Sequence, residues 1–120
     1  MPKKIGIVED EGIVALDIAG IVKSLGYETA FILDSGEKTI EKLKDIVPDA
    51  LLMDIELKGE LNGLQTALKL KENYNIPIIF LTAFEDENTI AKISNVSNDG
   101  YIVKPFEDEI LRITLEKVLG

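Results

Sequence analysis

Five short apolar runs recur along the chain, and a segment with the spacing of an amphipathic helix follows each of them. The runs at 4–8, 50–53 and 76–81 are nearly continuous in Ile, Val, Leu and Phe, which is typical of parallel strands covered on both faces. Two further runs lie at 29–33 and 101–103. Because strands that alternate with helices build a parallel sheet with right-handed crossovers, the sequence predicts an α/β fold.

The segments that separate the apolar runs predict five helices. We expect them within residues 11–27, 36–46, 62–71, 86–96 and 107–119. In the first, Ile18 and Val22 fall on one apolar stripe, and Gly26 is suited to the residue after a helix end. The pattern predicts a (βα)5 doubly wound sheet in one domain spanning residues 1–120. The last helix reaches Gly120, so we expect no effector domain within this sequence.

The composition excludes several kinds of chemistry. The chain has no cysteine, which excludes disulfides, thiolate metal sites and a cysteine nucleophile. It has no histidine, so neither a histidine base nor a phosphohistidine lies within it. A net charge of −9 opposes direct binding to nucleic acid or to an anionic membrane. No apolar run is long enough to span a bilayer and no signal peptide pattern is present, so we expect a cytoplasmic protein.

The residues that follow the strands are polar and carry the candidate chemistry. In a doubly wound sheet, ligands bind at the carboxyl ends of the strands. Those ends carry Glu9 and Asp10, Asp54, Thr82 and Lys104. Three close carboxylates raise one another's pKa, and a hard divalent cation with oxygen ligands removes that conflict. The pattern therefore predicts a Mg²⁺ site built from the acidic pair after the first strand and the aspartate after the third.

Four sequence elements carry a resemblance to a known family. They are VED at 8–10, LLMD at 51–54, FLTA at 80–83 and YIVKPF at 101–106, in this order and each at a strand end. With them the chain resembles a receiver domain of two-component response regulators over essentially its whole length. The resemblance implies a flavodoxin-like fold with strand order 2-1-3-4-5.

The resemblance implies a phosphoacceptor and a metal site. Asp54 would attack a phosphohistidine of a sensor histidine kinase, or of its phosphotransfer domain, to form an acyl phosphate. Asp10, Asp54 and the backbone carbonyl of Glu56 would ligate Mg²⁺ (or Mn²⁺), and Glu9 would act through a metal-bound water. A carboxylate nucleophile is already anionic and needs no general base, which suits a chain without histidine.

The resemblance also implies how the phosphoryl group is held and how the signal is passed on. Thr82 would hydrogen-bond the phosphoryl group, the backbone of Ala83 would contact it, and Lys104 would pair first with Asp54 and then with a phosphoryl oxygen. Thr82 and Tyr101 would be the switch residues that reshape a face formed by roughly residues 85–119. The domain would promote its own phosphorylation and dephosphorylation without being an enzyme. A homodimer through that face, and an effector or kinase domain in the same native chain, are further implied partners.

The sequence departs from the family pattern at two loops. IELKGELNG at 55–63 lacks the proline that commonly follows the acceptor aspartate, and NVSNDGY at 95–101 replaces a shorter, smaller sequence. We expect these loops to affect switching and the lifetime of the phosphoryl group. Glu56 and Phe84 flank the predicted pocket and are expected to tune hydrolysis. The bond between Lys104 and Pro105 is cis in relatives.

Other interpretations account for part of this pattern. Glu11 is an acid suited to the start of a helix, and Tyr101 fits fixed edge packing as well as a moving switch. An aspartyl phosphohydrolase would place a second aspartate where Glu56 stands. A Toprim-type site would use Glu9, Asp54 and Glu56, but its nucleic-acid substrate conflicts with the charge. An FMN-binding module would need a phosphate cradle where the chain is acidic, and a pseudo-receiver would lack the complete site set.

Overall fold

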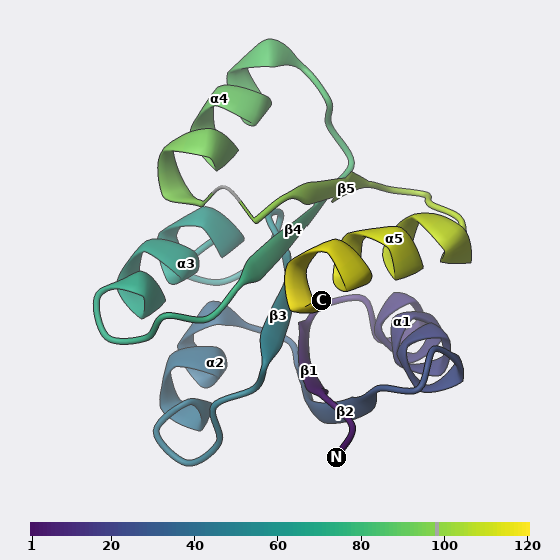
Figure 1. Ribbon diagram of the computed structural model, residues 1–120. Coiled ribbons are helices and arrows are strands. Elements are labelled where there is room, and N and C mark those ends of the chain that lie inside the picture. Colours follow the sequence, from purple (N-terminus) through teal and green to yellow (C-terminus); the bar gives the residue numbers. More distant parts are fainter. Residues whose placement is uncertain (98) are drawn as a thin grey trace.

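The protein is a five-stranded parallel sheet with helices on both faces (Figure 1). The computed structural model describes residues 1–97 and 99–120. The strand order is β2-β1-β3-β4-β5, and each neighbouring pair is parallel. The predicted (βα)5 fold and strand order are thereby confirmed. Along the chain the elements are β1 (Lys4–Val8), α1 (Gly12–Ser24), β2 (Glu28–Leu33), α2 (Gly36–Lys42), β3 (Ala50–Asp54), α3 (Gly63–Lys71), β4 (Ile78–Thr82), α4 (Glu87–Val96), β5 (Tyr101–Val103) and α5 (Asp108–Leu119).

The sheet separates two apolar layers. Helices α1 and α5 cover one face, while α2, α3 and α4 cover the other (Figure 1). Every residue of β3 and of β4 is buried, which explains why their sequences are continuously apolar instead of alternating. The two central strands therefore fix the positions of the residues at their carboxyl ends.

In the part of the chain that the structure describes, none of the helices has the length and the apolar character that a membrane span requires.

Two elements have bounds that differ from the prediction. Strand β4 begins at Ile78 and not at Ile76. The amide of Ile78 donates to the side chain of Asp99, and Pro77 has no amide hydrogen to donate. Helix α2 ends at Lys42, and the amides of Lys44 and Asp45 then donate to carbonyls three residues back instead of four. Ile46, which the periodicity assigned to the helix stripe, is consequently exposed.

The end of α1 and the start of α3 follow the signals in the sequence. Gly26 has a φ of +93°, and it and the next residue return hydrogen bonds to the last turn of α1, as in a Schellman motif. Asn62 and Gln65 form a reciprocal capping box at the start of α3. The first residue of α3 is packed against the end of β3: a Cβ at Gly63 would lie 2.1 Å from the carbonyl oxygen of Asp54. Only glycine fits this approach.

A polar cluster holds the segment that enters β5. Asp99 accepts hydrogen bonds on one carboxylate oxygen from Ser97 Oγ at 2.7 Å, from the Ile78 amide at 3.0 Å and from Lys71 Nζ at 3.1 Å. Lys71 also donates to the carbonyl of Ile76 at 3.0 Å. The cluster therefore links the end of α3, the start of β4 and the start of β5. Ser97 and Asp99 belong to the segment 95–101 that departs from the family pattern, and Asn98 between them lies outside the described residues.

The two edge strands are short or irregular. Strand β2 pairs with β1 through a register shift at Ile5 and Gly6 that passes over Ala30, as in a β-bulge. Strand β5 has three residues and pairs with β4. Beyond β5, the peptide bond between Lys104 and Pro105 is cis.

Candidate functional site

Three carboxylates meet at the carboxyl ends of β1 and β3. Glu9, Asp10 and Asp54 each offer an oxygen, and these oxygens lie within 4.8 Å of one another. Glu9 and Asp54 are 2% exposed, whereas Asp10 is half-buried at the rim. The parallel topology causes this convergence, because both strands run in the same direction and end at the same edge of the sheet. The structure thus brings together the acidic residues that the sequence predicted.

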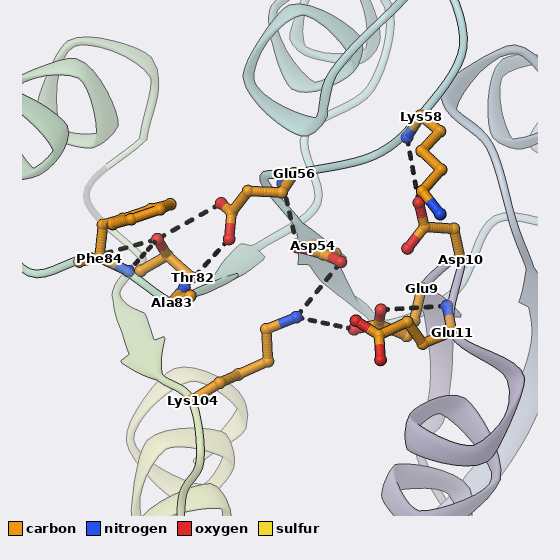
Figure 2. Close-up of polar contacts among 10 residues, drawn as sticks. All are labelled: Glu9, Asp10, Glu11, Asp54, Glu56, Lys58, Thr82, Ala83, Phe84 and Lys104. Atoms are coloured by element: carbon orange, nitrogen blue, oxygen red, sulfur yellow. Dashed lines mark hydrogen bonds and ion pairs between the residues drawn. The ribbon is translucent and has the colours of Figure 1, made fainter.

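Lys104 faces this cluster from the end of β5. Its Nζ lies 3.2 Å from Glu9 Oε2 and 3.3 Å from Asp54 Oδ2, and Figure 2 shows it directed at both. Burial alone would lower the pKa of Lys104, but the carboxylates of Asp54 and Glu9 outweigh burial and raise it above its ordinary value. The Lys104 ammonium therefore pairs with the two buried carboxylates of the cluster.

The surroundings of Glu9 disfavour the charged form of its carboxyl group. Burial raises the pKa of Glu9 to about 7, and the nearby carboxylate of Asp54 adds to the shift, while the Lys104 ammonium opposes it. The Glu9 side chain accepts a hydrogen bond from the amide of Glu11 at 3.2 Å. The amide and the lysine together do not fully compensate the charge.

Backbone amides orient the other two carboxylates. The Glu56 amide donates to Asp54 Oδ1 at 3.0 Å, and the Lys58 amide donates to Asp10 Oδ2 at 3.1 Å. Both amides belong to the loop after β3. The far end of this loop is anchored to α2, because the Leu61 amide donates to the Glu37 carboxylate at 2.8 Å. The loop thereby fixes both aspartates. The Lys58 amide was not predicted, because a backbone contact leaves no signal in residue identity.

A second group of contacts lies at the end of β4. Glu56 Oε1 accepts from the Ala83 amide at 3.0 Å, and Glu56 Oε2 lies 3.4 Å from Thr82 Oγ1. The Thr82 hydroxyl also accepts from the Phe84 amide at 3.0 Å and is 3.2 Å from the Phe84 carbonyl. The sequence placed Glu56 and Phe84 beside the pocket but did not predict that the Glu56 carboxylate reaches across to β4.

Tyr101 lies apart from these contacts. It is half-buried at the start of β5, where it packs against the apolar layer beneath α2, α3 and α4. It is paired in register with Phe80 of β4. Its assignment as a switch residue stays a prediction.

Asp10 and Asp54 border a cavity of about 520 Å³. Asp10, Asp54, Glu56, Ala83 and Lys104 line its polar part, and residues of α1 and Phe106 line its apolar part. Such a cavity, with a few converging polar groups, is the expected form of a small-ligand site.

The donor set fits Mg²⁺. Oxygen ligands from a few carboxylates, with room for waters and substrate oxygens, are what this cation favours. The geometric observation is that three carboxylate oxygens lie within 4.8 Å of one another, two of them on residues that are only 2% exposed, while Lys104 Nζ forms ion pairs with Glu9 and Asp54. Asp10, Asp54 and Glu9 are the side chains that would hold the ion.

Comparisons with known proteins agree with this geometry. The family model of the response regulator receiver domain matches residues 5–116 of this sequence. The DNA-binding response regulator MtrA of Mycolicibacterium paratuberculosis is 30% identical over 111 residues, which cover 92% of this chain and 48% of that protein. The chain spans about half the length of the curated relatives it matches.

Solved structures are similar over the whole chain. The signal receiver domain of a modulated diguanylate cyclase from Desulfovibrio desulfuricans has a TM-score of 0.90 and 34% identity, covering 99% of this chain and 94% of that one. The receiver domain of the sensor histidine kinase PA1611 from Pseudomonas aeruginosa, described with a magnesium ion coordinated in the active site cleft, has a TM-score of 0.89 and 26% identity. The match covers 100% of this chain and 99% of that one.

Proposed function

The chain belongs to the family of response regulator receiver domains, and from this premise we propose that Asp54 is its phosphoacceptor. The observation that carries the proposal is the placement of Asp54: a buried carboxylate at the end of a central strand, 3.3 Å from Lys104 Nζ and bordering the cavity. We propose that the whole chain, residues 1–120, acts as this one unit.

The proposed reaction is a phosphoryl transfer from a phosphohistidine. An Asp54 carboxylate oxygen attacks phosphorus, an O–P bond forms and the P–N bond to the donor imidazole breaks. The bonding electron pair leaves with the imidazole nitrogen, which takes a proton from solvent. No base is needed, because the nucleophile is already an anion.

The chain's own residues position the reactants. The Glu56 amide on Asp54 Oδ1 leaves the other oxygen, Oδ2, directed at Lys104. We propose that Lys104 then pairs with a phosphoryl oxygen, while the Thr82 hydroxyl and the Ala83 amide receive the others. Charge spread over the equatorial oxygens is what such donors stabilise.

The proposed metal site comprises Asp10, Asp54 and the backbone carbonyl of Glu56, with Glu9 acting through a water. When bound, a Mg²⁺ or Mn²⁺ ion supplies positive charge opposite the phosphoryl oxygens. Glu9 and Asp10 position the ion, and the Lys58 amide keeps Asp10 turned toward the cavity. These residues would also allow the domain to promote its own phosphorylation and dephosphorylation.

The signal and the partners follow from family membership. We propose a sensor histidine kinase, or its phosphotransfer domain, as the donor, and a cytoplasmic site of action. Phosphorylation would shift the population of two arrangements of the α4-β5-α5 face, with Thr82 and Tyr101 as switch residues. About 1.4 kcal/mol of differential interaction changes such a ratio tenfold. A homodimer through this face and an effector or kinase domain in the native chain are further proposals, and the similarity to a DNA-binding regulator supports the latter.

Phosphorylation by a small-molecule donor tests the proposal. The protein is incubated with phosphoramidate and Mg²⁺, and the intact mass is recorded. We expect one labile phosphoryl group on the native protein and none on Asp54→Asn. The matched control is Asp45→Asn, which removes the same charge from an exposed residue outside the site and should be modified like the native protein.

Two results would contradict the assignment. If the native protein gained no mass, the domain would not be a phosphoacceptor under these conditions of donor and cation. If Asp54→Asn kept the adduct, the acceptor would be another residue. Hydroxylamine cleavage of the adduct separates an acyl phosphate from a phosphoester.

A further inference from the structure

We propose that the carboxylate of Glu56 is an internal competitor for the phosphoryl group, held in the resting protein on the donors that the group needs. This inference rests on the proposed function of Asp54 and concerns the regulation of the same site. Ala83 and Thr82 are the two donors at the end of β4 in that proposal. In the structure, both contact a carboxylate that the chain itself provides.

The geometry of the contact resembles the binding of an oxyanion. The two carboxylate oxygens of Glu56 are divided between the two donors: Oε1 accepts from the Ala83 amide at 3.0 Å, and Oε2 lies 3.4 Å from Thr82 Oγ1. Figure 2 shows the side chain crossing from the loop after β3 toward β4, away from Asp10. An anion therefore already occupies the place where phosphoryl oxygens are expected.

The same loop connects the competitor to the acceptor. The Glu56 amide donates to Asp54 Oδ1 at 3.0 Å, so the backbone of this residue is held beside the acceptor while its side chain reaches the donors. A phosphoryl group on Asp54 would meet the Glu56 carboxylate at close range. Two anions competing for one set of donors repel each other, and the carboxylate must leave before the phosphoryl group is bound.

The competitor is free to leave. Glu56 is exposed, and among residues 1–97 and 99–120 no ion pair involves it. Within these described residues, the two contacts at β4 are the ones that hold its carboxylate. When the glutamate departs, the Thr82 hydroxyl can still donate to the Phe84 carbonyl at 3.2 Å. The displacement therefore makes the larger change at the Ala83 amide, which donates to Glu56 Oε1. The carboxylate thus contacts both donors from an exposed position, from which an incoming phosphoryl group can displace it.

The test compares Glu56→Ala, Glu56→Gln and the control Glu85→Ala. Glu85 is an exposed glutamate two residues after Ala83, so its removal changes the net charge near the site by the same amount without touching the donors. Phosphorylation rates with phosphoramidate are measured by intact mass at saturating Mg²⁺, with equal thermal stability of the variants verified first. We expect Glu56→Ala to react on the order of tenfold faster than the native protein, equivalent to about 1.4 kcal/mol. Glu56→Gln, which keeps an acceptor but loses the charge, should lie between them, and Glu85→Ala should stay within about twofold of the native rate, since exposed charges are screened.

A second readout needs neither metal nor donor. In the metal-free protein, the NMR resonance of the Ala83 amide should move in Glu56→Ala and stay in place in Glu85→Ala.

A third readout uses beryllofluoride, which is a phosphoryl analogue, together with Mg²⁺. Its affinity should be about tenfold higher for Glu56→Ala than for the native protein.

Each outcome decides the proposal. If Glu56→Ala reacted no faster than the native protein while the native protein was phosphorylated on Asp54, the competition would be refuted and the proposed function would stand. An equal gain in Glu85→Ala would also refute it, since general charge would then be the cause. If none of the proteins took up phosphorus, the proposed function would fail and the inference with it.

Discussion

The Asp99 cluster makes a specific prediction about stability, because one carboxylate oxygen there serves three donors. Replacing Asp99 with alanine removes the partner of the Ile78 amide, of Ser97 Oγ and of Lys71 Nζ at once. Replacing it with asparagine keeps an acceptor of the same shape and removes the charge. The two variants therefore separate the hydrogen-bond contribution from the ionic one.

The magnitude follows from burial. The side chain of Ile78 is fully buried, and a backbone amide left without a partner in such a setting costs about 1–3 kcal/mol. The side chains of Lys71 and Asp99 are 28% and 30% exposed, so their ion pair contributes at most about 1 kcal/mol. We expect Asp99→Ala to lower the free energy of unfolding by about 3 kcal/mol and Asp99→Asn by about 1 kcal/mol.

Urea denaturation at pH 7, followed by circular dichroism, measures both changes. The control is Asp45→Ala, which removes a carboxylate from an exposed residue near the end of α2 and should change stability by less than about 0.5 kcal/mol. If Asp99→Ala were no less stable than this control, the cluster would not anchor β5 and the reasoning would be wrong.

The pH dependence gives an independent check on the ionic part. Burial alone would raise the pKa of Asp99, but hydrogen bonds from Ser97 and Ile78 and the Lys71 ammonium outweigh it and hold the pKa below its ordinary value of 3.8. A carboxylate with a lowered folded-state pKa stabilises the protein above its unfolded-state pKa, and this stability is lost as the pH falls through the folded-state value. The difference between native protein and Asp99→Asn should therefore be complete at pH 7 and close below about pH 4. A difference that grew on acidification would contradict this sign.

Three other predictions concern the site. Gly63→Ala should destabilise the protein by about 3 kcal/mol in urea unfolding, because the new Cβ would lie 2.1 Å from the Asp54 carbonyl oxygen and 2.8 Å from the Ile55 Cα. Gly20→Ala, whose Cβ would meet no atom within 4 Å outside the backbone of its own helix and its two neighbours in the chain, should instead stabilise the protein by about 0.5–1 kcal/mol. Lys104→Met should destabilise the metal-free protein by about 2 kcal/mol at pH 8, since it leaves Glu9 and Asp54 without their cation. Added Mg²⁺ should restore part of the lost stability. An equal loss with and without Mg²⁺ would argue against a site in which Lys104 and the metal ion share these carboxylates. Asp10→Asn should weaken Mg²⁺ binding at least tenfold by calorimetric titration, which corresponds to about 1.4 kcal/mol, whereas unchanged binding would remove Asp10 from the ligand set.

Residue identity predicted the architecture and the acidic cluster because both follow from periodic or positional rules. Continuous apolar runs define buried parallel strands, and parallel strands deliver their carboxyl-end residues to one edge. Glu9, Asp10, Asp54 and Lys104 therefore converge as expected. That they act in phosphoryl transfer, and that Tyr101 moves, stay predictions.

The sequence was less informative where the outcome depends on competition between local contacts. The periodicity of 36–46 favoured a helix up to Ile46, but the helix ends at Lys42, and the amides of Lys44 and Asp45 then donate to carbonyls three residues back. The position of Glu56 after the acceptor was clear, whereas the direction of its carboxylate depends on the distance to the Ala83 amide on another strand. The cluster around Asp99 likewise joins residues far apart in the sequence, and a loop that departs from its family's pattern gives no indication of such a contact.

The irregular edges of the sheet bear on how the protein behaves at high concentration. An open edge strand offers unpaired amides and carbonyls to a neighbouring molecule, and a long, flat one is a starting point for aggregation. Here β5 offers three residues, and β2 is disturbed by its bulge at Ala30. Both features shorten the stretch over which a second chain could add in register. The two features therefore limit edge-to-edge polymerisation of the sheet.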